Sequence, residues 1–296
     1  MYRARLGIRP GIWLSIAVLL AAAGAASPAW ALDADNPGSS GWGLLNLPYG
    51  VTSISREVYG LHMMAFWVCI VIGAVVFGVM IWSIVFHRRS RGAAADVTLV
   101  HNTKVEIIWT TIPVLILIGM AIPAAHGIVL IGDDAHSQLD IKVTGFQWGW
   151  QYDYPGKDVS FISKLDTRSM AASELDSGIS PYSVPHYLRE VDHPLVVPVG
   201  TKIRLLITAV DVIHSWWVPD FGIKKDAIPG YINQSWFEVD ADKPGVYRGQ
   251  CAELCGRGHG YMPIVVDAVS KADFQAWVKR EAAAEKAAAT ANASSS

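Results

Sequence analysis

The chain has 296 residues, a formal net charge of −2 and 52% hydrophobic residues. This length allows one to three structural units. The near-neutral charge argues against a nucleic-acid partner, because phosphate binding needs a concentrated basic face and none is visible. The mean hydropathy of +0.30 is high for a soluble protein and indicates membrane segments.

The first 31 residues have the pattern of a secretory signal peptide. Three arginines stand before an apolar core at 12–26, and an A-x-A cleavage site ends at Ala31. We therefore predict that 1–31 is a signal peptide and that the main domain lies outside the cytoplasm. An uncleaved third helix is the alternative. Residues 32–60, rich in Gly, Pro, Ser and Asn, are expected to form an extended periplasmic arm.

Two apolar runs, 61–86 and 107–131, contain no Asp, Glu, Lys or Arg. Each is long enough to cross a bilayer, which takes about 20 residues. The loop 87–106 between them carries four basic residues: Arg88, Arg89, Arg91 and Lys104. The positive-inside rule places this loop in the cytoplasm. We expect a two-span protein of the bacterial inner membrane, in contact with lipid, with both mature termini in the periplasm.

From about residue 132 to residue 280 the pattern is that of a β domain. One strand is predicted over 141–154, where apolar and polar residues alternate. Its aromatic residues would share one face: Phe146, Trp148, Trp150, Tyr152 and Tyr154. Further strand candidates lie between Gly, Pro and Asp turns: 195–197, 202–209, 234–239, 245–251 and 263–269.

Short strands without alternating helices favour an all-β sandwich or barrel. The expected fold class is therefore a two-helix transmembrane hairpin followed by such a domain. A helix is predicted over 271–285, and the Ala- and Ser-rich residues 281–296 are expected to form a disordered tail. The segment 161–186 matches no regular pattern.

One short segment carries most of the chemistry. It holds two thiols, an imidazole and a thioether within twelve positions: Cys251, Cys255, His259 and Met262. A second imidazole, His214, comes earlier in the chain. Thiolate together with thioether favours copper over hard cations, and imidazole suits copper as well.

The number of ligands favours a dinuclear site. A mononuclear blue-copper site uses one Cys, two His and a weak Met, so this set has one Cys too many. The simplest arrangement is two copper ions bridged by both thiolates, each with one imidazole, and Met262 as a weak axial ligand. Such a closed site suits electron transfer. Zinc is an alternative on ligand type, although structural zinc seldom uses Met. A Cys251–Cys255 disulfide is another.

The motif Cys251-x-Glu-x-Cys255-Gly-x-x-His259-x-x-Met262 resembles the CuA copper motif of cytochrome c oxidase subunit II. Four further segments resemble parts of this family in the same order: 105–113, 146–150, 212–216 and 226–234. The resemblance runs from about residue 59 to residue 278. It implies a two-helix hairpin followed by a cupredoxin-like domain.

The resemblance also implies roles for individual residues near the metal. The copper ligands would be His214, Cys251, Cys255, His259 and Met262. Glu253 would offer its backbone carbonyl to copper and its carboxylate to a magnesium ion shared with subunit I.

Residues further from the metal gain roles by the same resemblance. Trp148 would be the point where electrons enter from cytochrome c, although Phe146 and Gly149 beside it depart from the family pattern. Glu106 would stand at the mouth of a proton channel of subunit I, or else simply stabilise a helix N-terminus. Four acids would attract the basic face of cytochrome c: Asp153, Asp158, Asp192 and Asp211.

The implied function is electron entry into cytochrome c oxidase. The chain would pass electrons from cytochrome c to the haem of subunit I, where oxygen is reduced to water and protons are pumped. Subunits I and III would be its partners, and the enzymatic activity would belong to the complex. Three alternatives are a membrane-tethered copper chaperone or thiol oxidoreductase, a quinol-oxidase subunit without copper, and the copper domain of nitrous oxide reductase. The full ligand set argues against the second, and the chain length against the third.

Overall fold

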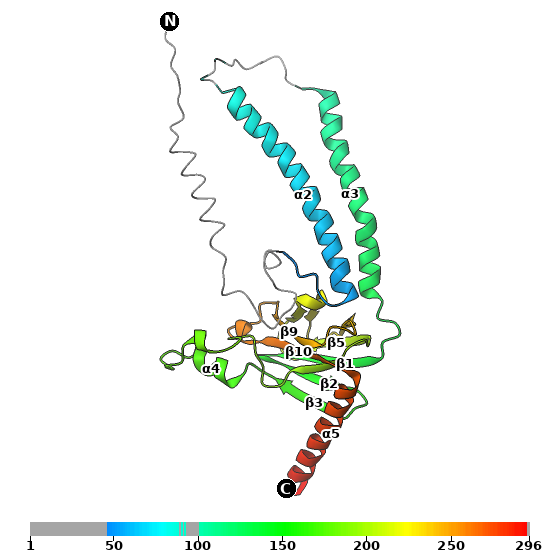
Figure 1. Cartoon of the computed structure of the whole chain (residues 1–296), viewed down its shortest axis with the longest axis vertical. Helices are drawn as coiled ribbons and strands as arrows, with labels where there is room; N and C mark the ends of the chain where they lie inside the picture. Colours follow the sequence, from blue (N-terminus) through cyan, green and yellow to red (C-terminus); the bar gives the residue numbers. More distant parts are fainter. Residues whose placement is uncertain (1–45, 89, 91, 93–100, 295–296) are drawn as a thin grey trace. The chain divides into compact units, whose positions relative to one another are not determined.

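The structure is a computed structural model that describes residues 46–88, 90, 92 and 101–294 (Figure 1). The predicted signal peptide, residues 32–45 of the predicted arm and part of the 87–106 loop lie outside these residues. All the elements described below belong to one compact unit, residues 47–296.

Two long apolar helices come first in this unit, α2 (Ser53–Phe86) and α3 (Thr103–Gly132). They run side by side in Figure 1. Both have the length and composition of membrane-crossing helices. Most of their large apolar side chains are exposed rather than packed in a core. The predicted two-helix hairpin is confirmed.

Both helices begin earlier than hydropathy predicted. Residues 53–60, expected to belong to an extended arm, form the first turns of α2, and 103–106, expected to be loop, form the first turn of α3. The reason is capping: the Thr52 hydroxyl accepts a hydrogen bond from the Ser55 amide, and the Asn102 side chain accepts from the Lys104 and Val105 amides. Hydropathy detects the apolar part of a helix and misses a polar, well-capped start.

Hydrogen bonds join the start of α2 to the β domain. Thr52 is fully buried, and its hydroxyl donates to the Phe221 carbonyl at 2.8 Å. The Arg56 guanidinium forms two hydrogen bonds with the Asp240 carboxylate, at 2.6 and 3.1 Å. At the other helix, the Trp236 indole donates to the Leu130 carbonyl at 3.2 Å. The hairpin is thus attached to the domain at both of its domain-side ends.

The β domain consists of two five-stranded sheets. The first has the order β3-β2-β1-β5-β8, with β3 (Val159–Ser163), β2 (Gly149–Tyr154), β1 (Leu139–Phe146), β5 (Ile203–Ala209) and β8 (Asn233–Phe237). The second has the order β4-β10-β9-β6-β7, with β4 (Leu195–Pro198), β10 (Pro263–Val269), β9 (Gly245–Cys251), β6 (His214–Val218) and β7 (Ile223–Ala227). Side chains from both sheets form one hydrophobic core, so the predicted sandwich is confirmed.

The predicted strand at 141–154 is in fact two antiparallel strands. Phe146 pairs with Gly149, and Gln147 and Trp148 form the turn between β1 and β2. Trp150, Tyr152 and Tyr154 share one face as predicted, and this face is buried, but Phe146 lies on the opposite face. The error has a simple cause: alternation continues through a two-residue hairpin turn, so the pattern alone does not reveal the turn.

Several elements were not predicted. Strands β3, β6 and β7 are only five residues each, and the unassigned segment contains the short helices α4 (Thr167–Ser173) and η4 (Pro181–Ser183). The predicted disordered tail is helical as far as it is described, because α5 spans Lys271–Ser294. Its Ala-rich composition has high helix propensity. The Glu285 carboxylate also accepts a hydrogen bond from the Ser160 amide of β3 at 3.1 Å.

The buried Thr52 hydroxyl predicts the cost of loosening α2 from the domain. Thr52→Ala removes both the cap and the bond to Phe221, so we expect a loss of about 1–2 kcal/mol in stability. The measurement is the thermal unfolding midpoint of the full-length chain in detergent. Thr52→Ser keeps the hydroxyl and serves as the control. Equal midpoints for Thr52→Ala and the wild type would show that this contact contributes nothing.

Candidate metal centre

Two neighbouring strands of the second sheet bring the candidate ligands together. His214 is the first residue of β6 and Cys251 is the last residue of β9. The strands pair antiparallel with Trp216 opposite Cys251, and the Ala252 amide donates to the Ser215 carbonyl at 3.0 Å. The two ligands therefore lie at the same end of the sandwich.

Three potential ligands form a tight, buried cluster. The ligating atoms of His214, Cys251 and Cys255 all lie within 4.8 Å of one another. The two sulfur atoms are 3.8 Å apart and both cysteines are free, so the disulfide alternative, which needs a bond of about 2 Å, is not present. Since metal–thiolate bonds are about 2.3 Å long, one ion can contact both sulfurs.

The remaining predicted ligands lie beside this cluster. The His259 Nδ1 atom, in the short helix η6 (His259–Tyr261), is 3.6 Å from the Cys255 sulfur. Met262 is 1% exposed and belongs to the same core cluster as the two cysteines. Its carbonyl accepts from the Cys251 amide at 3.1 Å, which closes the loop between β9 and β10. This donor set of soft sulfur and imidazole nitrogen fits copper.

The Glu253 backbone and side chain face different surroundings. Its carbonyl lies 3.4 Å from the Cys251 sulfur, next to the cluster. Its carboxylate is exposed. The backbone oxygen is thus close to the candidate ligands, and the side chain is accessible to another molecule.

The two thiols differ in acidity. Burial disfavours the thiolate of Cys251, but hydrogen bonds from His214 and from the Ser215 backbone outweigh burial and lower its pKa to about 6. Burial raises the pKa of Cys255, and the neighbouring Cys251 charge raises it further. One thiol of the pair is therefore readily ionised, which favours the capture of a metal ion.

The imidazole of His214 is held from three sides. Its Nε2 atom lies 2.9 Å from the Asp211 carboxylate, and its Nδ1 atom lies 4.0 Å from the Cys251 sulfur. The Trp150 ring packs edge-on to it at 6.0 Å. Gly145 leaves room for the ring, because a β-carbon there would come within 3.0 Å of His214 Cδ2. Sequence patterns gave no signal for Gly145, and Asp211 was assigned only to docking.

Trp148 lies directly against the ligand loop. Its indole N–H donates to the Cys255 carbonyl at 3.1 Å, and the Gln147 side-chain amide donates to the same oxygen at 2.9 Å. A β-carbon on Gly258 would come within 2.3 Å of the indole, so the ring packs on the backbone of this loop. A partly exposed tryptophan is thereby one hydrogen bond away from the backbone of a candidate ligand.

The four predicted docking acids do not form one patch. Asp211 accepts a hydrogen bond from the Gln147 amide, next to Trp148. Asp192 accepts from the Lys164 amide, and the Lys164 ammonium lies 5.5 Å from the Phe146 ring. These two acids are therefore near the β1–β2 turn.

The other two acids lie at the opposite end of β2. Asp153 pairs with Lys142 and accepts from the Ser160 hydroxyl at 2.6 Å, while Asp158 is exposed in the turn between β2 and β3. Since β-strands extend about 3.3 Å per residue, Asp153 is separated from Gly149 by about 13 Å along the strand. A partner centred on Trp148 would meet Asp192 and Asp211 first.

Phe146 and Gly149, the two residues that depart from the family pattern, lie against each other. A β-carbon on Gly149 would come within 2.7 Å of the Phe146 ring, so the ring occupies the space that a side chain at 149 would need.

Glu106 is separate from this region: it lies in the first turn of α3, where its carboxylate accepts a hydrogen bond from the Asn102 backbone amide at 3.3 Å.

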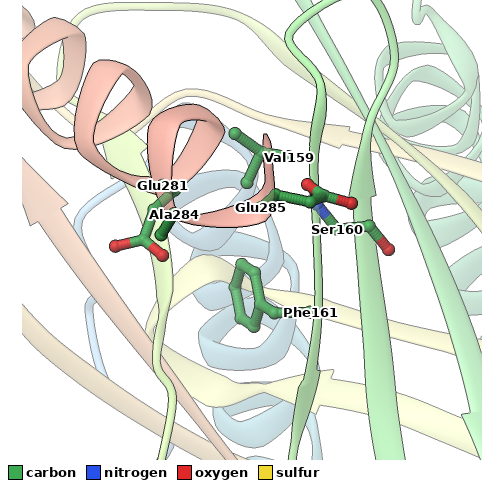
Figure 2. A pocket seen from close by; sticks show the side chains of 6 residues that line it. All are labelled: Val159, Ser160, Phe161, Glu281, Ala284 and Glu285. Atoms are coloured by element: carbon green, nitrogen blue, oxygen red, sulfur yellow. The ribbon is translucent and has the colours of Figure 1, made fainter. Parts of the chain in front are cut away.

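A cavity of about 300 Å³ lies elsewhere in the domain, between β3 and α5. Figure 2 shows its lining residues: Val159, Ser160, Phe161, Glu281, Ala284 and Glu285. None of the predicted site residues is among them. This cavity is therefore separate from the candidate metal centre.

Comparisons with known proteins match both parts of the chain. Residues 40–126 match the family model of the cytochrome c oxidase subunit II transmembrane domain, and residues 139–269 match that of its periplasmic domain. A probable cytochrome c oxidase subunit 2 of Rickettsia bellii is 39% identical over 227 residues, covering 76% of this chain and 79% of the relative.

Two further proteins are similar. Cytochrome c oxidase subunit 2 of Cereibacter sphaeroides is 40% identical over 205 residues, or 66% of each chain. The crystal structure of the periplasmic domain of subunit II of cytochrome oxidase from Bradyrhizobium japonicum is 39% identical, with a TM-score of 0.41, and the match covers 49% of this chain and 94% of that one.

The close packing of Gly145 against His214 leads to a test of the cluster. Gly145→Ala places a methyl group against the imidazole, so we expect copper affinity to fall by about tenfold or more. The affinity is measured by competition with a chelator. Gly260→Ala is the control, because a β-carbon there meets nothing within 4 Å. If both variants bind copper like the wild type, the position of the His214 ring is not important for metal binding.

Proposed function

The chain belongs to the cytochrome c oxidase subunit II family, and on this premise we propose that it is the electron-entry subunit of a haem–copper oxidase. It is a membrane-anchored protein with a C-terminal soluble domain. In our proposal it accepts electrons from cytochrome c and passes them to the haem of subunit I. Oxygen reduction to water and proton pumping belong to the complex, which also includes subunit III.

The observation that carries this proposal is the convergence of two free thiols and two imidazoles at one buried end of the sandwich. Cys251, Cys255, His214, His259 and Met262 would hold two copper ions. The Glu253 carbonyl is close enough to contribute as well. Bound copper supplies one-electron redox chemistry at this site.

The protein's contribution is to bind, orient and shield this group. The two thiols and His214 are almost fully buried, so bulk water is excluded from the ligand atoms. The strand pairing and the loop between β9 and β10 hold the donors in place before any metal arrives. A preformed site of this kind limits structural change during electron transfer.

Trp148 is the proposed entry point for electrons. Its partly exposed ring can contact a donor protein. Its indole N–H donates a hydrogen bond to the Cys255 carbonyl, which gives electrons a short route to a copper ligand. Asp192 and Asp211 would attract a basic partner such as cytochrome c to this side. Asp153 and Asp158 would contribute more weakly, at longer range.

Three further roles belong to the same proposal. The exposed Glu253 carboxylate would bind magnesium at the contact with subunit I. Glu106, at the start of α3, would serve the entrance of a proton channel there. The copper domain and both mature ends of the chain would face the periplasm, and the two helices would contact lipid and subunit I.

Copper stoichiometry and electron paramagnetic resonance on the full-length chain test the proposed site. We expect two copper ions per chain with one unpaired electron shared equally between them, because the two thiols are adjacent and each has an imidazole beside it. Cys251→Ser should abolish this signal. One copper ion per chain, or none with Cys251 and Cys255 joined in a disulfide, would overturn the dinuclear site and favour a thiol-exchange or chaperone function.

Trp148 gives a test of the entry point in the assembled oxidase. Trp148→Phe removes the hydrogen bond from the indole N–H to the Cys255 carbonyl, so we expect electron transfer from cytochrome c to slow by about tenfold or more. Stopped-flow kinetics measure this step, and the copper spectrum should stay unchanged. Trp277→Phe, in α5, is the matched control. Equal rates for the two variants would remove Trp148 from the route.

A further inference from the structure

The hydrogen bonds of Asp211 assign it a role beyond partner attraction. Resting on the copper site proposed above, we propose that Asp211 is a positioning residue that holds the His214 imidazole toward the sulfurs and fixes the Gln147–Trp148 turn at the same time. Electrostatic docking would be only part of its function.

The first half of this role concerns the tautomer and orientation of His214. An ionised carboxylate can only accept hydrogen bonds, so the contact of 2.9 Å places the proton on His214 Nε2. Nδ1, the nitrogen that faces the Cys251 sulfur, is then the one that offers its lone pair to a metal ion, once the proton it shares with the sulfur is released. A carboxylate behind a ligating histidine both orients the ring and makes it a stronger donor to the metal.

The second half concerns the turn that carries Trp148. The other carboxylate oxygen of Asp211 accepts from the Gln147 amide at 2.7 Å. Gln147 and Trp148 in turn donate from their side chains to the Cys255 carbonyl. Asp211 therefore joins a chain of hydrogen bonds that runs from His214 through the turn to Cys255, on both sides of the candidate centre.

Asp211 itself has little freedom to move. The oxygen that faces His214 also accepts from the Val212 amide at 2.7 Å. Three donors thus fix one carboxylate. An amide in its place offers only one acceptor oxygen, and its NH₂ group can only donate. Asp211→Asn therefore cannot accept from both the His214 ring and the Gln147 amide through separate oxygens.

The experiment compares two variants that change charge equally. Asp211→Asn and Asp176→Asn each remove one carboxylate, but Asp176 is exposed in the segment between α4 and η4 and has no role in the proposed site or in docking. Both are made in the full-length chain, purified in detergent and loaded with copper. The readouts are copper affinity, the electron paramagnetic resonance spectrum, the reduction potential of the copper site, and the reaction with cytochrome c.

We expect Asp211→Asn to lower copper affinity by about tenfold or more, to alter the spectrum and to raise the reduction potential. The potential rises because a less basic imidazole stabilises oxidised copper less. Asp176→Asn should match the wild type in copper affinity, spectrum and reduction potential, and in the reaction with cytochrome c. Asp211→Glu retains a carboxylate acceptor and should restore most of the affinity, which also guards against a variant that fails to fold.

The contrary outcome is equally clear. If Asp211→Asn keeps the affinity, spectrum and potential of the wild type and only slows the reaction with cytochrome c, Asp211 acts in docking alone and the inference is wrong. Failure of the proposed function itself would be seen separately, as a wild-type chain that binds no copper pair.

Discussion

The antiparallel pairing of β6 with β9 is the constraint on which the candidate centre depends. It places His214, at the start of one strand, beside Cys251, at the end of the other. A register shift of one residue would turn one of these side chains to the opposite face of the sheet, and the cluster would be lost. Cys255, His259 and Met262 follow in the loop that leaves β9, so their positions depend on the same pairing.

The sequence was sufficient where chemistry or composition is local. The spacing of Cys251, Cys255, His259 and Met262 predicted a loop of metal ligands, and the structure brings its two cysteines and His259 together with His214. Two long apolar runs predicted the helical hairpin, and separate short strands predicted a sandwich. Each of these signals is contained in a continuous stretch or in a distinctive residue type.

The features that were not predicted from the sequence depend on contacts between distant segments. No pattern shows that Gly145 must be small, because the reason is a ring that lies 69 positions later, in β6. The turn at Gln147 and Trp148 was not predicted, because apolar and polar residues alternate without a break through it. This turn reverses the chain, so that Phe146 before it and the buried aromatic residues after it lie on opposite faces of the hairpin. The docking acids looked equivalent in the sequence, whereas strand direction places two near Trp148 and two far from it.

The helical end of the chain has a consequence for solubility at the membrane. β3 is the outer strand of its sheet, and an unpaired outer strand can recruit a strand from another molecule. The Glu285 carboxylate of α5 accepts a hydrogen bond from the Ser160 amide, and the helix lies alongside this strand (Figure 2). Copies anchored in one bilayer are confined to two dimensions and meet often. Covering this strand edge therefore protects crowded neighbours from aggregation.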